Sequence, residues 1–324
     1  MVRTSQGADP GTVPTSWDYT DPTKDTIRLD LSRGYDQIID GLELRDSLVV
    51  YKESSVYRVD YVGGQFVDNF VKVLGITGAM NRNCIATIDG YHAVFAGFDC
   101  IVHDGQQARS VLDKVTRLWL YQNIDVSNAG LCFVMTAPFF NKVLFCFPTP
   151  GNSVCNKAVE WDWTTNTVGM RDLPSSYCGF AGPVDNGLGA TFDADSASFN
   201  SHTNSFDGGT IVPSLARCMV GGTGPHFYQL DSSTSADGSL VQAYLERRAL
   251  SFDIPEQRKL VSEVRPRILG NAGDTVIVKV GSQDDPFAEP TWQTRTHTIG
   301  STVSNSFLVD GRYIAIRFET GTAT

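Results

Sequence analysis

Few side chains in this chain combine the types and the spacing that catalysis requires. The most suggestive pair is His103 and Asp104, because a carboxylate can hold an imidazole in the orientation needed for proton transfer. Adjacent residues of a strand point to opposite faces, however, so these two side chains cannot easily act together. We therefore expect Asp104 to cap a turn and His103 to face solvent.

Paired carboxylates are a second possible source of chemistry, because glycoside hydrolases place two of them about 5–10 Å apart across a pocket. The chain offers Asp60, Glu246 and the adjacent Asp284 and Asp285, but the sequence does not show which of them meet. The repeated Asp boxes of sialidase-type propellers are absent from the sequence. We predict no catalytic residue and no enzyme activity.

Motifs for cofactors and metals are equally sparse. Gly221–Gly224 is rich in glycine, but it links two predicted strands and lacks the helix N-terminus that attracts phosphate. Asp193 and Asp195 look like the start of a calcium loop, yet the Gly and Glu of an EF-hand do not follow. The five histidines form no HExxH-type pair. We predict no cofactor and no metal ligand.

The cysteines and tryptophans fit a packed core better than a reactive site. No Cys-x-x-Cys pair occurs, which argues against a zinc ribbon or a thioredoxin-like site. We expect the cysteines to be buried free thiols, as suits folding in a reducing cytoplasm. Trp161 and Trp163 lie two residues apart, hence on one face of a strand, where core packing is favoured over stacking on a sugar or a partner. The seven cysteines are Cys84, Cys100, Cys132, Cys146, Cys155, Cys178 and Cys218.

Charge and hydropathy exclude two classes of protein. The formal net charge is −10, and no cluster of five or more Lys and Arg residues is present. This argues against specific DNA binding, which depends on cationic contacts to phosphates, but it suits the wall of a conduit that must repel them. The first 17 residues lack the apolar core of a signal peptide, and no run of about 20 apolar residues occurs. We expect neither secretion nor membrane insertion.

The elements that must position these residues are short β-strands joined by turns. Four segments each contain two runs of apolar or alternating apolar and polar residues, as the two strands of a hairpin do. The second run of each segment ends at an aspartate, which we call its acidic corner. The corners lie roughly 40 to 70 residues apart, a spacing that brackets the ~40–50 residues of a four-stranded propeller blade. We predict an all-β fold of propeller-like antiparallel blades, with a plain β-sandwich as the alternative. The hairpins cover 46–60, 91–105, 142–162 and 216–231, and the corners are Asp60, Asp104, Asp162 and Asp231.

Composition divides the chain into three predicted parts. Residues 1–40 are polar and punctuated by Pro and Gly, so they are expected to form an extended N-terminal arm. Residues 41–254 form the propeller-like domain, in which 183–214 is a long insertion rich in Gly, Ser, Asn and Asp. The alternation at 259–265 and 275–281 predicts an additional C-terminal β-sheet unit, or closing blades, over 255–324.

Several of these strands and turns resemble a known group of proteins, the nozzle or tail hub proteins of short-tailed bacteriophages, also called tail stabilisation or tail tubular B-like proteins. The run DSLVVYKESSVYRV at 46–59, followed by YVGG at 61–64 and Phe66, carries the resemblance. Similar runs lie at 88–95 and 102–105, and the ending GRYIAIRF at 311–318 is similar to the last strand of those proteins.

The resemblance implies a structural virion protein of the phage tail, assembled in the host cytoplasm. Such subunits contain a β-propeller and form a homo-hexameric ring below the portal and adaptor rings. The ring extends the DNA channel, helps to retain the genome, and docks tail fibres or spikes, while DNA passes without specific binding.

Two other functions stay open at this point. A carbohydrate-binding propeller that recognises a host receptor would show an exposed aromatic cluster, and it would more often be trimeric. A propeller glycoside hydrolase would require a central pocket lined by carboxylates.

Overall fold

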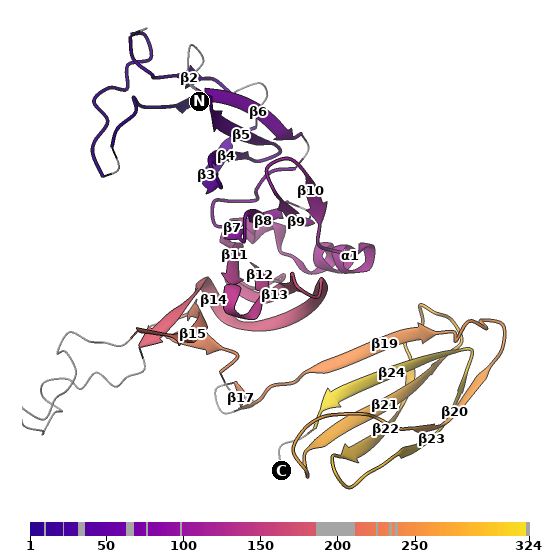
Figure 1. The fold of residues 1–324 in the computed structure, drawn as a ribbon. Helices are drawn as coiled ribbons and strands as arrows, with labels where there is room; N and C mark the ends of the chain where they lie inside the picture. Colours follow the sequence, from indigo (N-terminus) through magenta and orange to yellow (C-terminus); the bar gives the residue numbers. More distant parts are fainter. Residues whose placement is uncertain are drawn as a thin grey trace, which may run out of the picture. The chain divides into compact units, whose positions relative to one another are not determined.

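The fold is mostly β, with 52% of residues in strands and 7% in helices, which confirms the all-β prediction (Figure 1). It is known from a computed structural model. Two compact units, Met1–Ser232 and Ser233–Thr324, follow one another along the chain and are described separately. The structure describes residues 1–321 except 10, 22, 32–35, 63–67, 76, 98, 186–210, 225, 233–234 and 237–238.

The first sheet is an antiparallel meander of four strands that follow each other in sequence. Its order is β3 (Ile38–Leu44), β4 (Ser47–Lys52), β5 (Val56–Tyr61) and β6 (Asp68–Leu74). The preceding segment pairs β1 (Val2–Arg3) with β2 (Arg28–Leu29) and packs its apolar side chains on one face of this sheet. The buried Lys52 fixes that segment, because its Nζ donates to the Leu31 carbonyl at 2.9 Å and lies 3.4 Å from Asp36. Part of the first 40 residues therefore packs on one face of the first sheet and shields that face from solvent.

A second four-stranded meander packs on the other face of the first. It consists of β7 (Ile85–Ile88), β8 (Tyr91–Ala96), β9 (Asp99–His103) and β10 (Ala108–Ser110). Asp89 and Gly90 form the β7–β8 turn with positive φ angles of 32° and 77°, as tight hairpins require. The core between the two sheets contains Leu44, Val49, Tyr51, Val56, Ala79, Val94 and Ile101.

The third sheet has six strands and follows the helical segment of the unit. Helix α1 (Lys114–Asn123) is capped at its N-terminus by Asp113, whose carboxylate accepts from the Thr116 amide at 2.7 Å, and η1 (Val126–Leu131) follows. The sheet order is that of the sequence: β11 (Phe133–Ala137), β12 (Lys142–Phe147), β13 (Cys155–Asp162), β14 (Thr167–Asp185), β15 (Ile211–Gly222) and β16 (Phe227–Leu230), with η2 (Pro138–Phe140) between the first two.

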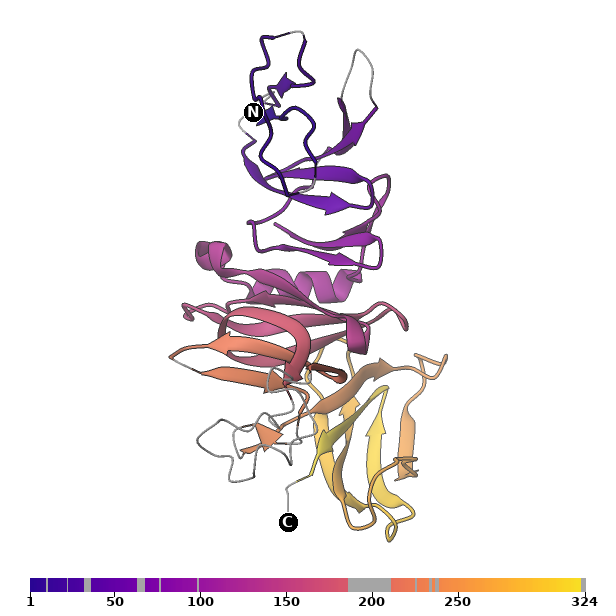
Figure 2. The ribbon, with the colours of Figure 1, turned by 60° about the vertical axis from the view of Figure 1, so that its left-hand side comes forward.

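One face of the third sheet packs against the second sheet and α1, and the sheet then curls around its opposite face into a half-barrel (Figure 2). The curl is strongest in the 19-residue β14, where the register with β15 shifts between Ser176 and Cys178. Gly179 permits it, since a Cβ there would lie 2.5 Å from the Met135 sulfur. The third and fourth predicted hairpins thus share one sheet, contrary to a reading of each as a separate blade.

The second unit is a small two-layer β-sandwich. One sheet has the order β19 (Tyr244–Leu250), β24 (Tyr313–Thr320), β21 (Thr275–Gln283) and β22 (Thr291–Thr298), and the other pairs β20 (Lys259–Val264) with β23 (Asn305–Gly311). Val278, Val280, Phe307, Val309 and Ile314 fill the space between them. The short pair β17 (Ser235–Ala236) and β18 (Ser239–Leu240) precedes the sandwich.

Two predicted boundaries differ from this arrangement. The C-terminal unit begins before the predicted residue 255, because β19 pairs along its length with the last strand, β24. The ends of the predicted insertion 183–214 belong to β14 and β15, and its central residues 186–210 lie outside the described residues. No helix in the described part of the chain is long and apolar enough to span a membrane.

Candidate functional site

The densest group of polar ring side chains lies between the first and second sheets. Tyr51 on β4 places its hydroxyl oxygen 2.7 Å from His92 Nδ1 on β8 and 2.5 Å from His103 Nε2 on β9. All three side chains are at most 1% exposed. The opposite nitrogens are also bonded, with His92 Nε2 2.9 Å from the Glu43 carbonyl and His103 Nδ1 3.2 Å from the Gly105 amide.

The backbone partners fix every proton of this Tyr–His–His relay. The Glu43 carbonyl can only accept, so His92 carries its proton on Nε2 and its Nδ1 accepts from the Tyr51 hydroxyl. The Gly105 amide can only donate, so His103 carries its proton on Nε2 and donates it to the Tyr51 oxygen. Both histidines are therefore neutral, and the chain of bonds runs in one direction from Gly105 to Glu43.

The relay is shielded from any substrate, and its contribution is structural. Replacing Tyr51 with Phe would leave the His103 Nε2–H and His92 Nδ1 without partners in a buried place. We expect this change to lower the free energy of unfolding by about 2–4 kcal/mol, measured by urea unfolding. Tyr61→Phe is the matched control, since Tyr61 is 74% exposed, and it should change stability by less than about 0.5 kcal/mol. Equal effects of the two changes would refute the assigned bonds.

Of the two predictions for the pair His103 and Asp104, the turn cap at Asp104 is confirmed and the solvent-facing His103 is wrong. Asp104 does cap a turn, accepting from the amides of Gln106 and Gln107 at 2.9 and 2.8 Å. His103 does not face solvent but is 1% exposed. The reason is that the second sheet is covered on both faces, so neither side of β9 is available to water.

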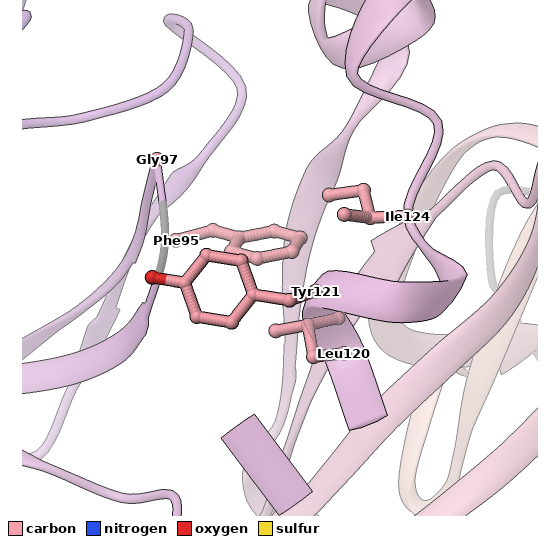
Figure 3. Close-up of a pocket in the computed structure, with 5 residues that line it drawn as sticks. All are labelled: Phe95, Gly97, Leu120, Tyr121 and Ile124. Atoms are coloured by element: carbon pink, nitrogen blue, oxygen red, sulfur yellow. The ribbon is translucent and has the colours of Figure 1, made fainter. Parts of the chain in front are cut away.

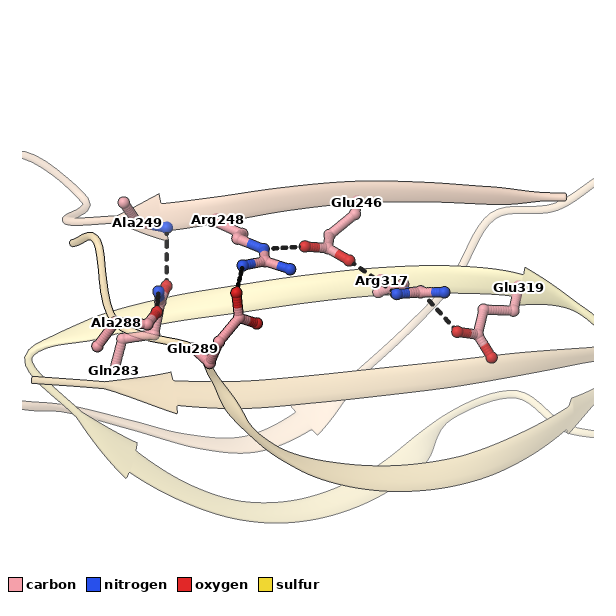
Figure 4. Close-up of polar contacts among 8 residues, drawn as sticks. All are labelled: Glu246, Arg248, Ala249, Gln283, Ala288, Glu289, Arg317 and Glu319. Carbon is pink, nitrogen blue, oxygen red and sulfur yellow. Dashed lines mark hydrogen bonds and ion pairs between the residues drawn. The ribbon is translucent and has the colours of Figure 1, made fainter. Parts of the chain in front are cut away.

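The other carboxylates considered for catalysis are engaged in ion pairs and turns. Asp60 bonds to Arg58 and Ser47 in the first unit. In the second unit Asp284 pairs with Arg258 at 2.8 Å, and Asp285 accepts from the Phe287 amide. Glu246 belongs to a row of alternating charges across β19, β24 and β21 (Figure 4).

This row has as many positive as negative side chains. Arg317 bridges Glu246 at 3.1 Å and Glu319 at 2.5 Å, and Lys279 reaches Glu319 at 2.8 Å. Arg248 bonds to Glu246 and, at 2.8 Å, to Glu289. Because each carboxylate already contacts a cation, the row offers a substrate neither a free general base nor a free acid.

Trp161 packs as predicted, and the glycine-rich turn links two strands as predicted. Trp161 is 1% exposed in the core between the second and third sheets, and Trp163 packs at the edge of the same core. Gly221 and Gly222 end β15, and the next strand is β16. Asp193 and Asp195 lie outside the described residues.

The cysteines are unpaired, and six of the seven are buried. Burial raises the pKa of Cys84 and of Cys155 to about 12, so these thiols stay protonated and unreactive at neutral pH. Cys178 is the exposed one. In the part of the chain that the structure describes, no three His, Cys, Asp or Glu side chains are grouped to hold a metal ion.

A small cavity beside α1 is too small for a substrate. Its volume is about 10 Å³, and Phe95, Gly97, Leu120, Tyr121 and Ile124 line it (Figure 3). Sites for small molecules usually have about 300–1,000 Å³. This cavity has room for about one water molecule and no more.

An exposed apolar surface, which we call the outer patch, is the strongest candidate for function among the described residues. It consists of Cys178, Phe180, Met219 and Phe227 on the three adjacent strands β14–β16. Their sequence neighbours Gly179, Ala181, Cys218, Val220 and Tyr228 point into the half-barrel, so these four point outward. Phe180 is 48% exposed and Phe227 is 70% exposed.

The outer patch has the make-up of a protein contact surface. Gly221 lies between Cys178 and Phe227, and its missing side chain leaves a recess there. Arg217 and Gln229 lie at the margin, in the neighbouring register positions. Apolar residues that cluster on a surface with a polar margin commonly mark interaction sites. The sequence did not reveal the patch, because alternation alone does not show which face of a strand stays uncovered.

No protein-family model matches the sequence, and no curated protein is similar enough to count as a match.

Proposed function

We propose that this protein is a structural subunit of a short bacteriophage tail, where it forms the nozzle or hub ring. The observation that carries the proposal is the outer patch, because a cluster of exposed apolar side chains on one face of a β-sheet commonly marks a surface that a partner covers. The resemblance of the strands at 46–66, 88–105 and 311–318 to nozzle proteins supports the same assignment.

The stack of sheets supports a propeller-like reading of the first unit. Two four-stranded meanders and a third, larger sheet pack face to face in sequence order, as successive propeller blades do. We propose that the unit is an incomplete propeller, whose first sheet is covered by the N-terminal segment.

The distribution of charge suits a conduit for DNA. Residues 1–232 contain 25 Asp and Glu against 16 Lys and Arg, whereas residues 233–324 contain 11 against 10. Almost the whole net charge therefore belongs to the first unit. We propose that the first unit contributes the channel wall, so that genomic DNA is repelled and passes without specific binding.

The ring is proposed to be a homo-hexamer that docks on the adaptor and portal proteins and carries tail fibres or spikes. In a cyclic ring each subunit offers one surface to one neighbour and a different surface to the other. The outer patch is proposed as one of these two surfaces, covered by the next copy of the chain.

The test combines assembly with a surface variant. The full chain, alone and mixed with the portal–adaptor complex of its phage, is examined by mass photometry and negative-stain microscopy. We expect a six-fold ring for the wild type. The double change Phe180→Ser and Phe227→Ser should leave the monomer folded by circular dichroism but reduce ring formation at least about 10-fold, the effect of about 1.4 kcal/mol.

Leu260→Ser is the matched control, since Leu260 is an exposed apolar residue of the second unit, and it should leave the ring unchanged. A wild-type chain that stays monomeric or trimeric with and without the complex would overturn the nozzle assignment. A ring unaffected by the double change would overturn the role of the outer patch alone. Binding of the wild type to surface glycans through Phe180 and Phe227 would instead favour the receptor-recognition alternative.

A further inference from the structure

The junction between the first and second sheets differs from the junction between the second and third. Among the residues that the structure describes, seven buried side chains form the core of the first junction and sixteen form the core of the second. The first junction alone contains the Tyr–His–His relay, with donors and acceptors contributed by both sheets. It is thus the junction with less apolar burial and with buried imidazoles inside it.

We propose that the relay of Tyr51, His92 and His103 is a pH-sensitive latch, which holds the first sheet on the second at neutral pH and releases it upon acidification. The proposal does not depend on the assembly proposed above, because it concerns one chain.

Each site of protonation breaks a specific bond. A proton added to His103 Nδ1 would face the Gly105 amide hydrogen, so the bond between them is lost. A proton added to His92 Nδ1 would donate to the Tyr51 oxygen, and the Tyr51 hydroxyl hydrogen would lose its acceptor. In either case a positive charge is buried together with an unsatisfied donor, which strongly favours the separated sheets.

The charged groups around the relay offset this cost only in part. The negative charge of Asp104 raises the pKa of His103, but less than burial lowers it, and the Asp104 carboxylate already accepts from two turn amides. Arg58 donates to the Gly105 carbonyl at 3.0 Å and adds positive charge. Arg45 lies over the Tyr91 ring, and Glu43 contributes its carbonyl while the residue is exposed. Among the described residues, no carboxylate hydrogen-bonds to either histidine ring.

The pH range follows from the histidines. Burial lowers the pKa of His103 to about 4, with a further contribution from His92, and burial also lowers the pKa of His92. A separated sheet exposes these rings, whose pKa then returns to about 6.5. The latch is therefore fully effective above pH 6.5 and weakens as the pH falls towards 4. His103 alone raises the separated population about 30-fold between pH 8 and pH 5.

Hydrogen exchange of the full chain, followed by mass spectrometry, measures this population. Peptides from β4 and β5 report the first junction, and peptides from β12 and β13 in the same molecule are the internal reference. After correction for intrinsic exchange rates, we expect protection in β4 and β5 to fall about 30-fold or more from pH 8 to pH 5, with much smaller change in the reference.

The variant His92→Gln/His103→Gln removes both titratable rings but keeps amide donors and acceptors, and its protection should lose this pH dependence. His297→Gln is the control, since His297 is a buried histidine of the second unit, and it should behave like the wild type. The latch would be overturned if protection of β4 and β5 in the wild type did not change between pH 8 and pH 5. It would also be overturned if the double variant lost as much protection on acidification as the wild type. If the double variant does not fold, an NMR titration of wild-type His103 decides, because a pKa of 6 or higher contradicts the proposal.

Discussion

Replacing Trp161 with Ala is expected to lower the free energy of unfolding of the first unit by about 3–5 kcal/mol. The indole is 1% exposed in the core that joins the second and third sheets, so its removal leaves a cavity that the surrounding strands cannot fill. Two polar contacts are lost as well. Its Nε1–H donates to the Asn166 side-chain oxygen at 3.2 Å, and the Arg109 guanidinium lies over the ring at 5.4 Å.

Urea and thermal unfolding followed by circular dichroism measure this loss, which corresponds to about 6–20 °C in Tm. Trp163→Ala is the control, because Trp163 lies at the edge of the same core and is only partly buried. We expect it to cost less than about 2 kcal/mol. If Trp163→Ala proved the more damaging change, the assignment of Trp161 to the centre of this core would be wrong.

Replacing Gly78 with Ala is expected to destabilise the first unit by at least about 3 kcal/mol. Gly78 belongs to the link between the first two sheets, where the next amide, that of Ala79, donates to the Lys52 carbonyl at 3.0 Å. A Cβ on Gly78 would overlap that carbonyl oxygen and lie 2.6 Å from the carbonyl carbon of Glu53. Both obstacles are backbone atoms, so only a shift of the link itself can relieve the overlap.

The matched control is Gly97→Ala, because no atom lies within 4 Å of a Cβ built there. It should change the free energy of unfolding by less than about 0.5 kcal/mol. Urea unfolding of the two variants beside the wild type gives the comparison. A tolerated Gly78→Ala would mean that the link does not pass this close to the β4–β5 turn.

Four hairpins could be predicted from the sequence, but the other strands that complete their sheets, and the grouping into sheets, could not. Alternation and turn residues correctly located β4 with β5, β8 with β9, β12 with β13, and β15 with β16. The third and fourth of these hairpins were expected in separate blades. They share a sheet because β14 is long enough to pair with β13 through its first half and with β15 through its second. The alternation of apolar and polar residues does not show how long a strand is or where it bends to pair with a second neighbour.

Helix α1 was not predicted, and the reason is its weak amphipathic pattern. Leu120 is the only buried residue among its ten, and Val115 and Leu118 are exposed. Apolar residues therefore occupy several sides of the helix, and no single face stands out in the sequence.

The candidate site could not be predicted for a related reason. His103 and Phe180 both belong to strands of mixed apolar and polar residues, yet one is buried and the other is nearly half exposed. What separates them is whether another sheet covers that face, which depends on contacts between residues far apart in sequence. The buried relay joins residues 51, 92 and 103, and no local motif links these positions.

The order of strands determines when each of the two units can fold during synthesis of the chain. In the sheets of the first unit every strand pairs with a strand next to it in sequence, so each sheet can form as soon as its own residues leave the ribosome. In the second unit the last strand, β24, lies between β19 and β21 and bonds to both. The sandwich therefore cannot close until synthesis reaches residue 320. Until then β19 and β21 lack their common partner, and a nascent chain presents two unpaired strand edges after the first unit has already folded.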